Sequence, residues 1–159
     1  MQISLHEVEG QTLRVGTRRG EKARPPLLLF NGIGANIELV EPFLNALDGP
    51  EAIIFDVPGV GGSPSPWLPY RPSTLARLSA RLLDQLGHAQ VDVLGLSWGG
   101  ALAQQFAFQQ GERCRRLVLA ATSPGHLMVP AKLTVLLKMA TPRRYKDSKY
   151  RRARQDSNL

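Results

Sequence analysis

The residues that say most about this chain are Val91-Asp-Val-Leu-Gly-Leu-Ser97-Trp-Gly-Gly-Ala-Leu-Ala-Gln-Gln-Phe-Ala107. The apolar, β-branched run Val91–Leu96 predicts a strand, and the residues after Ser97 predict a helix that ends near Gly111. The turn between them reads Gly-Leu-Ser-Trp-Gly. A strand, a Gly-x-Ser-x-Gly turn and a helix in this order are typical of a nucleophile elbow.

The two glycines of this turn have a mechanical reason. A serine at such a corner occupies a strained backbone position, and Gly95 and Gly99 must lack side chains so that the strand and the helix can pack closely. The turn would present the Ser97 hydroxyl beside a helix N-terminus, whose unpaired N–H groups favour a developing oxyanion. We therefore interpret Ser97 as a candidate catalytic nucleophile. The alternative is a glycine-rich corner with a passive serine.

Composition and charge indicate an ordinary soluble domain. The 159 residues suffice for one domain with a buried core. The single cysteine, Cys114, cannot form an intrachain disulfide, which fits a reducing cytoplasm. No signal peptide and no apolar run long enough to cross a membrane is visible. The net charge of +7 is concentrated in residues 142–159, which supply +5, so the remainder of the chain is almost balanced.

Apolar runs alternate with helical patterns along the chain. Strands are predicted at 3–8, 12–15, 27–30, 52–55, 91–96 and 117–121, and helices at 37–47, at 75–86 and after Ser97. Ser73 is the expected N-cap of the second helix and Gly87 its end. Strands that alternate with helices predict an α/β fold with a largely parallel sheet.

Two glycine-rich loops follow predicted strands: Asn31-Gly-Ile-Gly-Ala-Asn36 and Asp56-Val-Pro-Gly-Val-Gly-Gly-Ser63. Neither completes a G-x-G-x-x-G motif, and no Gly-Lys-Ser/Thr is present, so nucleotide binding is not predicted. Both loops are expected at the carboxyl ends of strands, where open α/β sheets bind ligands. The second loop, Asp56 included, is expected to have a structural role.

In an acyl-transfer site the first loop would have a catalytic role. Its Ile33 N–H could pair with the Trp98 N–H to hold an oxyanion, and Asn31 and Gly32 would lie against the substrate. The alternative is a conformational turn with no part in catalysis. We expect no metal ion and no cofactor.

Four segments resemble the α/β-hydrolase fold and, more narrowly, the intracellular poly(3-hydroxyalkanoate) depolymerases of bacteria. The segments are Phe30-Asn-Gly-Ile-Gly34, Phe55-Asp-Val-Pro-Gly-Val-Gly-Gly-Ser63, Gly95-Leu-Ser-Trp-Gly-Gly-Ala-Leu-Ala-Gln-Gln-Phe106 and Leu117-Val-Leu-Ala-Ala-Thr122. The resemblance extends from about residue 27 to residue 145. It implies hydrolysis of the ester between 3-hydroxy fatty acid units through an acyl-enzyme, in the cytoplasm and at a polyester granule. Position by position, Ser97 matches the nucleophile of that family, and Ile33 and Trp98 match its backbone oxyanion donors.

A serine nucleophile also needs an imidazole to take its proton and a carboxylate to orient that imidazole. In this fold the order along the chain is Ser, acid, His. After Ser97 the only histidine is His126, and Glu112 is the only acidic residue between them; we expect His126 in a loop or lid and Glu112 away from the site. His6 and His88 precede the serine and are not expected to act. The acid and histidine of the family are expected beyond residue 159.

These observations predict three segments. Residues 1–124 form the N-terminal part of an α/β-hydrolase core, 125–145 begin a lid, and 146–159 form a basic tail that is disordered or read out of frame. The fold is expected to be truncated before its last strands and most of the lid, the chain to be inactive, and residues 117–121 to form an open sheet edge that favours association.

Two alternatives remain open. The chain could descend from another hydrolase of this fold, such as a small-ester esterase or a carbon–carbon bond hydrolase. It could also be a non-catalytic chain that binds an anionic partner through its basic tail. Nucleic acid is the less favoured partner, because no nucleic-acid-binding motif is present.

Overall fold

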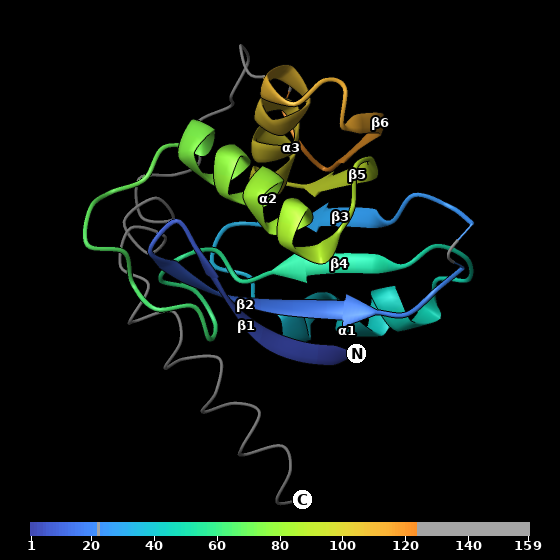
Figure 1. The fold of residues 1–159 in the computed structure, drawn as a ribbon, viewed down its shortest axis with the longest axis horizontal. Helices are drawn as coiled ribbons and strands as arrows, with labels where there is room; N and C mark the ends of the chain where they lie inside the picture. Colours follow the sequence, from blue (N-terminus) through green and yellow to red (C-terminus); the bar gives the residue numbers. More distant parts are fainter. Residues whose placement is uncertain (22, 124–159) are drawn as a thin grey trace, which may run out of the picture. The chain divides into compact units, whose positions relative to one another are not determined.

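The computed structural model describes residues 1–21 and 23–123. These residues form a mixed, mostly parallel sheet with helices packed against it (Figure 1). Its strand order is β1-β2-β4-β3-β5-β6. The strands are β1 Gln2–Val8, β2 Gln11–Arg18, β3 Leu27–Phe30, β4 Ala52–Phe55, β5 Val91–Leu96 and β6 Cys114–Ala120. The helices are α1 Ile37–Ala46, α2 Pro72–Leu86 and α3 Trp98–Gln109. The α/β class and the largely parallel sheet expected from the sequence are confirmed.

The first two strands form an antiparallel hairpin, and the other four run parallel to one another. Glu9 and Gly10 connect β1 to β2 with φ angles of 49° and 78°, the double left-handed turn that matches the twist of a hairpin. β2 pairs antiparallel with β4, whereas β4, β3, β5 and β6 are parallel neighbours. All four parallel strands therefore end at the same edge of the sheet.

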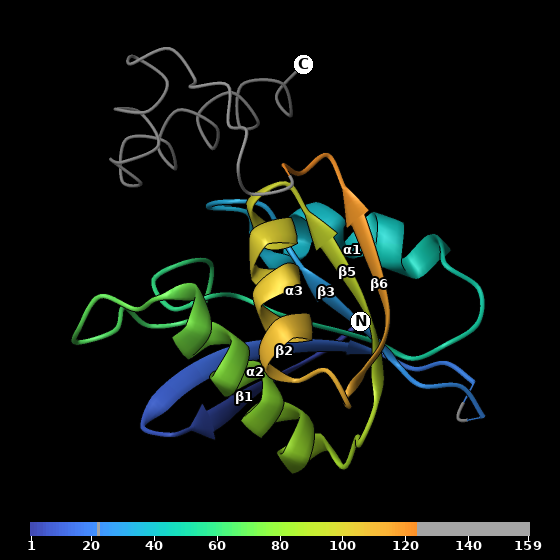
Figure 2. The same ribbon diagram turned by 90° about the horizontal axis from the view of Figure 1, so that it is seen from above.

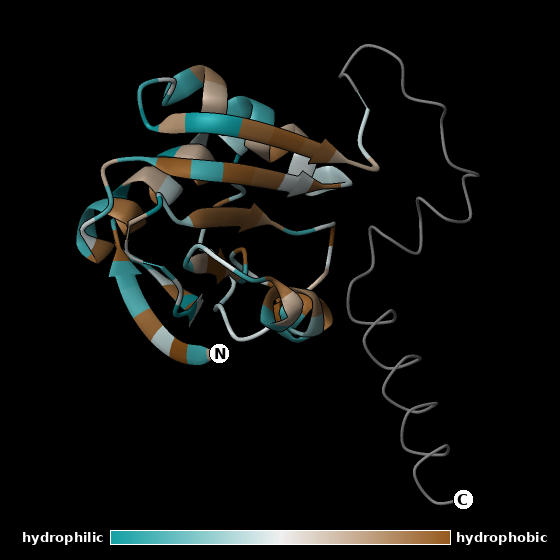
Figure 3. Cartoon of the chain, turned by 90° about the vertical axis from the view of Figure 1, so that its right-hand side faces the viewer, coloured by the Kyte–Doolittle hydropathy of each residue, from teal (hydrophilic) through white to brown (hydrophobic). Residues whose placement is uncertain are grey.

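Helices cover both faces of the sheet, α1 on one side and α2 with α3 on the other (Figure 2). Alternate residues of β3 divide between the faces, since side chains along a strand point alternately to its two sides. Leu28 and Phe30 belong to the core under α2 and α3, and Leu29 belongs to the core under α1. The Phe30 ring lies 6.0 Å from the Phe55 ring and 5.8 Å from the Phe106 ring, centre to centre. The short central strands are accordingly apolar over their length (Figure 3).

The second helix begins differently from the sequence expectation. Its N-cap residue is Arg71, which makes no side-chain capping hydrogen bond, and Pro72 is the first helical residue. The prediction that Ser73 caps this helix was therefore wrong. Proline has a φ suited to the first turn and lacks the N–H that would be unpaired there, so it can start a helix without a capping side chain.

The end of the same helix agrees with the prediction. Gly87 has a φ of 78°, its N–H donates to the Asp84 carbonyl, and the His88 N–H donates to the Leu83 carbonyl at 2.9 Å. This pair of hydrogen bonds is a Schellman motif, which glycine permits because it adopts left-handed backbone angles without a steric penalty.

β6 lies at the edge of the sheet, and no other strand of the described residues pairs with its outer side. Leu117, Val118 and Leu119 are exposed there, although they alternate between the two faces. No helix in the described residues is both long and apolar enough to cross a bilayer. The expected lid start at 125–145, the basic tail at 146–159 and His126 lie outside the described residues.

Candidate active site

Ser97 occupies the corner between β5 and α3. Its backbone angles are φ 54° and ψ −119°, which residues other than glycine rarely adopt. Its N–H donates to the Ala120 carbonyl of the neighbouring strand at 2.9 Å, and its side chain is exposed. The strained corner predicted from Gly-x-Ser-x-Gly is therefore present. Such strain persists only where the surroundings enforce it.

The glycine before the serine allows the strand and its own helix to meet. A Cβ placed on Gly95 would lie 2.5 Å from the Gly100 Cα and 2.7 Å from the Ala103 Cβ, well inside van der Waals contact. The expectation that Gly95 serves close strand–helix packing is confirmed.

The glycine after the serine has a different neighbour. A Cβ on Gly99 would lie 2.1 Å from the Phe30 carbonyl oxygen and 2.4 Å from the Asn31 carbonyl oxygen. The contact is with the end of β3 and not with β5. Gly99 thus lets the first turn of α3 lie directly against the loop formed by residues 31–36, here called the 31–36 loop.

The 31–36 loop lies beside Ser97. A Cβ on Gly32 would be 3.7 Å from the Ser97 Cβ, which is ordinary van der Waals contact. Within the described residues, neither the Ile33 N–H nor the Trp98 N–H donates a hydrogen bond. The structure thus brings Gly32 and Ser97 together and leaves one backbone donor unused on each of the two segments around the serine.

Hydrogen bonds from Asn31 close this loop. The Asn31 side-chain nitrogen donates to the Asn36 carbonyl at 2.9 Å, and its side-chain oxygen accepts the Gly32 N–H at 2.9 Å. A turn bond of 3.1 Å runs from the Ala35 N–H to the Gly32 carbonyl. The Asn31 amide, expected to contact substrate, is thus engaged within the loop itself.

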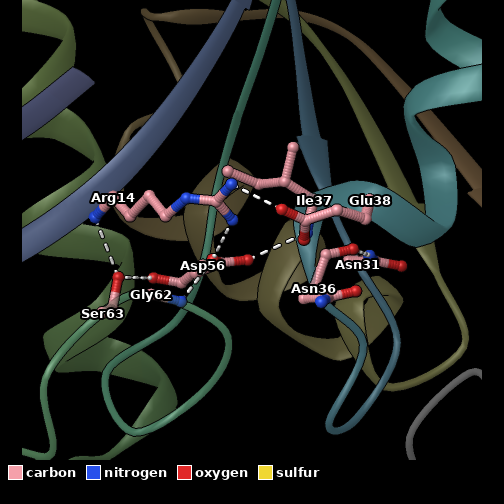
Figure 4. A network of polar contacts seen from close by, with 8 residues as sticks. All are labelled: Arg14, Asn31, Asn36, Ile37, Glu38, Asp56, Gly62 and Ser63. Atoms are coloured by element: carbon pink, nitrogen blue, oxygen red, sulfur yellow. Dashed lines mark hydrogen bonds and ion pairs between the residues drawn. The ribbon is translucent and has the colours of Figure 1, made fainter. Parts of the chain in front are cut away.

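Asp56 is the centre of a polar network behind the loop (Figure 4). Its side chain is fully buried and accepts three donors: the Ile37 N–H at 2.9 Å, the Gly62 N–H at 2.8 Å and the Arg14 guanidinium at 2.9 Å. The Arg14 guanidinium also binds Glu38, and this hydrogen bond lowers the pKa of the Glu38 carboxyl and raises the pKa of Arg14. Three donors therefore satisfy the Asp56 carboxylate within the protein, which is consistent with the structural role expected for this loop.

A hydroxyl extends this network to the second loop. The Ser63 hydroxyl donates to the Asp56 carbonyl at 2.6 Å and accepts the Arg14 N–H at 2.9 Å. The 56–63 loop is therefore bonded to β2 through both the backbone and the side chain of Arg14. No local sequence pattern indicated this connection, because Arg14 lies in a strand that is distant along the chain from both loops.

The histidines of the described residues lie far from Ser97. His6, in β1, pairs with the Ser4 hydroxyl at 3.0 Å, and four strand spacings of about 4.8 Å separate β1 from β5. His88 lies 3.5 Å from Glu51 and precedes β5, so the length of that strand, about 20 Å, separates it from Ser97. Neither imidazole can reach the serine hydroxyl.

Glu112 also lies away from the serine. Its carbonyl accepts a hydrogen bond from the Gln90 side chain at 3.2 Å, and Gln90 comes just before β5. Glu112 is therefore at the amino end of that strand, as expected. Within residues 1–21 and 23–123, no three His, Cys, Asp or Glu side chains gather as a metal site would require.

Comparison with known proteins agrees with this architecture. Residues 25–151 match the family model described as alpha/beta hydrolase fold. The chain is 59% identical over 140 residues to a poly(3-hydroxyalkanoate) depolymerase of Ectopseudomonas oleovorans, an alignment that covers 87% of this chain and 50% of that protein. It is 30% identical over 105 residues to 3-oxoadipate enol-lactonase 2 of Acinetobacter baylyi, with 65% and 39% covered. The chain thus spans half or less of the length of these curated relatives.

A solved structure shows the same likeness in three dimensions. A hydrolase from Pseudomonas aeruginosa PA01 superimposes with a TM-score of 0.70 at 33% identity, over 76% of this chain and 46% of that one. The family match covers most of the chain, and the strand order and the serine corner agree with the resemblance noted in the sequence. The chain belongs to the alpha/beta hydrolase fold family.

Proposed function

We propose that this chain belongs to a serine ester hydrolase of the poly(3-hydroxyalkanoate) depolymerase type, in which Ser97 is the nucleophile. The observation that carries the proposal is the strained Ser97 backbone, at φ 54°, on the corner beside the 31–36 loop. The 59% identity to the depolymerase of Ectopseudomonas oleovorans supports the substrate class. The similarity to an enol-lactonase supports ester cleavage as the type of reaction.

In the proposed reaction the Ser97 hydroxyl oxygen attacks the ester carbonyl carbon and its proton passes to a general base. The N–H groups of Ile33 and Trp98 stabilise the negative charge on the carbonyl oxygen of the tetrahedral intermediate. The intermediate collapses, the alcohol leaves with the proton from the base, and an acyl-enzyme remains. Water then attacks the acyl-enzyme in the same way and releases the acid.

The general base is not among the described residues, since His6 and His88 cannot reach Ser97. We infer that this chain alone turns over esters about a million-fold more slowly than a hydrolase with a complete triad. Turnover of 4-nitrophenyl butyrate by the purified chain tests this inference. A rate typical of a competent esterase that is lost in the His126→Ala variant would overturn it and assign the base to His126.

The identity of the nucleophile is tested by covalent labelling with a fluorophosphonate, which transfers its phosphonyl group to an activated serine hydroxyl and releases fluoride. The reaction is run on the chain joined to the C-terminal half of the Ectopseudomonas oleovorans relative, because a serine hydroxyl without a general base is a poor nucleophile and reacts too slowly to be labelled. The expected result is one phosphonyl group per chain on Ser97, with none on the Ser97→Ala variant. Equal labelling of the two proteins would refute the proposed role of Ser97.

Substrate class and location belong to the same proposal. We expect the hydrolase to act on polyester of 3-hydroxy fatty acids in the cytoplasm, at the surface of storage granules. The experiment compares release of 3-hydroxyoctanoate from the polymer with cleavage of short soluble esters, in the chain joined to the C-terminal half of the Ectopseudomonas oleovorans relative. Cleavage of soluble esters without release from polymer would favour a small-ester esterase instead.

A further inference from the structure

We propose that Asn31 and Asp56 are positioning residues that hold the 31–36 loop in the conformation that aims the Ile33 N–H at the oxyanion. The inference rests on the proposed function, because it assigns these two side chains to the same site. Neither side chain would touch the substrate. Both would act through the backbone of the loop.

Asn31 fixes the loop from within. The Asn31 side chain accepts a hydrogen bond from the Gly32 N–H and donates one to the Asn36 carbonyl. It therefore links the start of the loop to its last residue. Ile33 lies between these two bonds. The peptide plane that carries the Ile33 N–H also carries the Gly32 carbonyl, which accepts the Ala35 N–H at 3.1 Å. That plane can rotate only if this turn bond, which lies between the two Asn31 bonds, is lost.

Asp56 fixes the loop from outside. Its carboxylate accepts the N–H of Ile37, the residue that follows the loop and begins α1. The other carboxylate oxygen is held by the Gly62 N–H and by Arg14 of β2. Because the Asp56 side chain is fully buried, water cannot replace these donors. The far end of the loop is thus fixed relative to β2 and β4, which are rigid parts of the sheet.

The opposite side of the loop lies against the serine corner. Gly99 packs against the carbonyl oxygens of Phe30 and Asn31, with no room for a side chain between them. Gly32 packs beside the Ser97 Cβ. A loop held at its start by Asn31, at its end by Asp56 and on its side by α3 has little freedom to move. Misplacing a catalytic group by 1 Å can cost about a hundredfold in rate, so this rigidity matters if Ile33 donates to the oxyanion.

The experiment compares Asn31→Ala and Asp56→Asn with Glu38→Gln. The Glu38→Gln variant changes the other partner of Arg14 but contacts no amide of the loop, so it is the matched control. Each variant is first shown to be folded by circular dichroism and thermal unfolding. The rate of Ser97 phosphonylation, in the chain joined to the C-terminal half of the Ectopseudomonas oleovorans relative, is then measured against reagent concentration. This separates the limiting rate from the half-saturating concentration.

The expected result is a 10- to 100-fold lower limiting rate in Asn31→Ala and Asp56→Asn, with a half-saturating concentration close to that of the wild type. The control should stay within twofold of the wild type. Limiting rates in Asn31→Ala and Asp56→Asn within twofold of the wild type would overturn the proposal while leaving Ser97 as the nucleophile. If Asp56→Asn does not fold, the result for Asn31→Ala decides the test. The Asn31 side chain is only half-buried, so its removal is expected to leave the protein folded.

A second measurement does not depend on the proposed function. Amide hydrogen exchange, followed by NMR, reports the protection of the N–H groups of Gly32, Ala35 and Ile37. If the wild type is not labelled at Ser97, the nucleophile proposal fails, and exchange still tests the positioning role. Faster exchange in Asn31→Ala at Gly32 and Ala35, but not at the N–H groups of the distant β1–β2 hairpin, supports that role; unchanged exchange overturns it.

Discussion

Gly95 of β5 and Gly100 of α3 lie so close together that a single added carbon would not fit between them: a Cβ on Gly95 would be 2.5 Å from the Gly100 Cα. The atoms that it would meet belong to the backbone and to the Cβ of Ala103, so no flexible side chain can move aside. The corner that carries Ser97 therefore depends on this contact.

The first prediction concerns that contact. Gly95→Ala should lower the free energy of unfolding by about 2–3 kcal/mol, because the strand and the helix must separate to admit the methyl group. Gly111→Ala is the control, since a Cβ there meets only the Ala107 carbonyl at an ordinary 3.4 Å. Urea denaturation measures both variants. A loss in Gly95→Ala no larger than in Gly111→Ala would contradict the packing argument.

The second prediction concerns the strain at Ser97. Ser97→Gly should be more stable than Ser97→Ala by about 1 kcal/mol, because glycine adopts a φ of 54° without the penalty that a Cβ brings. Both variants lack the hydroxyl, so their difference reports the backbone strain less the extra conformational entropy of glycine in the unfolded chain. The measurement is the midpoint of urea-induced unfolding, compared between variants whose free energy of unfolding has the same dependence on urea concentration. Equal midpoints would contradict this prediction, because the strain relieved by glycine would then be no larger than its entropic cost in the unfolded chain.

The third prediction separates a buried ion pair from a surface pair. Arg14→Ala should lower the free energy of unfolding by about 3 kcal/mol, because it leaves the buried Asp56 carboxylate without a cationic partner. Arg81→Ala is the comparison: Arg81 is 60% exposed and pairs with Glu9 and Asp84 at the surface, so its loss should cost less than about 1 kcal/mol. Chemical denaturation at pH 7 tests the difference, and similar costs for the two variants would refute it.

The fourth prediction is a pH dependence. The hydrogen bond from Arg14 lowers the pKa of Glu38 below its ordinary value of 4.5, so the unfolded chain binds the proton more readily than the folded chain. The stabilisation is complete above pH 4.5 and is lost as the pH falls through the lowered pKa. The free energy of unfolding of Glu38→Gln should therefore change less with pH below 4.5 than that of the wild type. Denaturation curves from pH 3 to pH 6 provide the measurement, and parallel pH profiles for both proteins would contradict it.

The fifth prediction concerns the edge of the sheet. Exposed apolar side chains on β6 should promote association of the chain, because the outer edge of β6 pairs with no strand of residues 1–21 and 23–123 and also presents apolar surface. Val118→Lys should shift sedimentation toward the monomer. Leu39→Lys is the control, since Leu39 is 52% exposed on α1 and Val118 is 54% exposed on β6. An equal effect of both substitutions would assign the association to apolar surface in general.

Much of the fold could be read from local sequence patterns. The predicted strands at 27–30, 52–55 and 91–96 have the same bounds in the structure, because short apolar runs buried on both faces end sharply at loop residues. The second strand was predicted too short: β2 was expected at 12–15 but extends from Gln11 to Arg18. Its last two residues pair with β4, at Thr17↔Ile53 and Arg18↔Ala52, and that partner is distant in sequence.

The residues of the candidate site also fall into two groups, those indicated by local sequence and those identified only by the structure. Ser97 and the glycine at 95 were indicated by five adjacent residues, since a sharp corner has its own sequence requirements. By contrast, no local pattern showed that Gly99 lies on the end of β3, or that Asp56 binds the first N–H of α1. Those contacts join residues that the chain separates by 19 positions or more.

The sequence by itself determined which residues form strands, helices and the strained corner at Ser97, because backbone angles and burial periodicity are properties of neighbouring residues. Tertiary structure alone decided that β4 lies between β2 and β3, and that Arg14, Asp56 and Asn31 together hold the loop beside the serine. The physical reason is that hydrogen bonds of a buried carboxylate are set by what surrounds it in space, and its neighbours along the chain do not specify them.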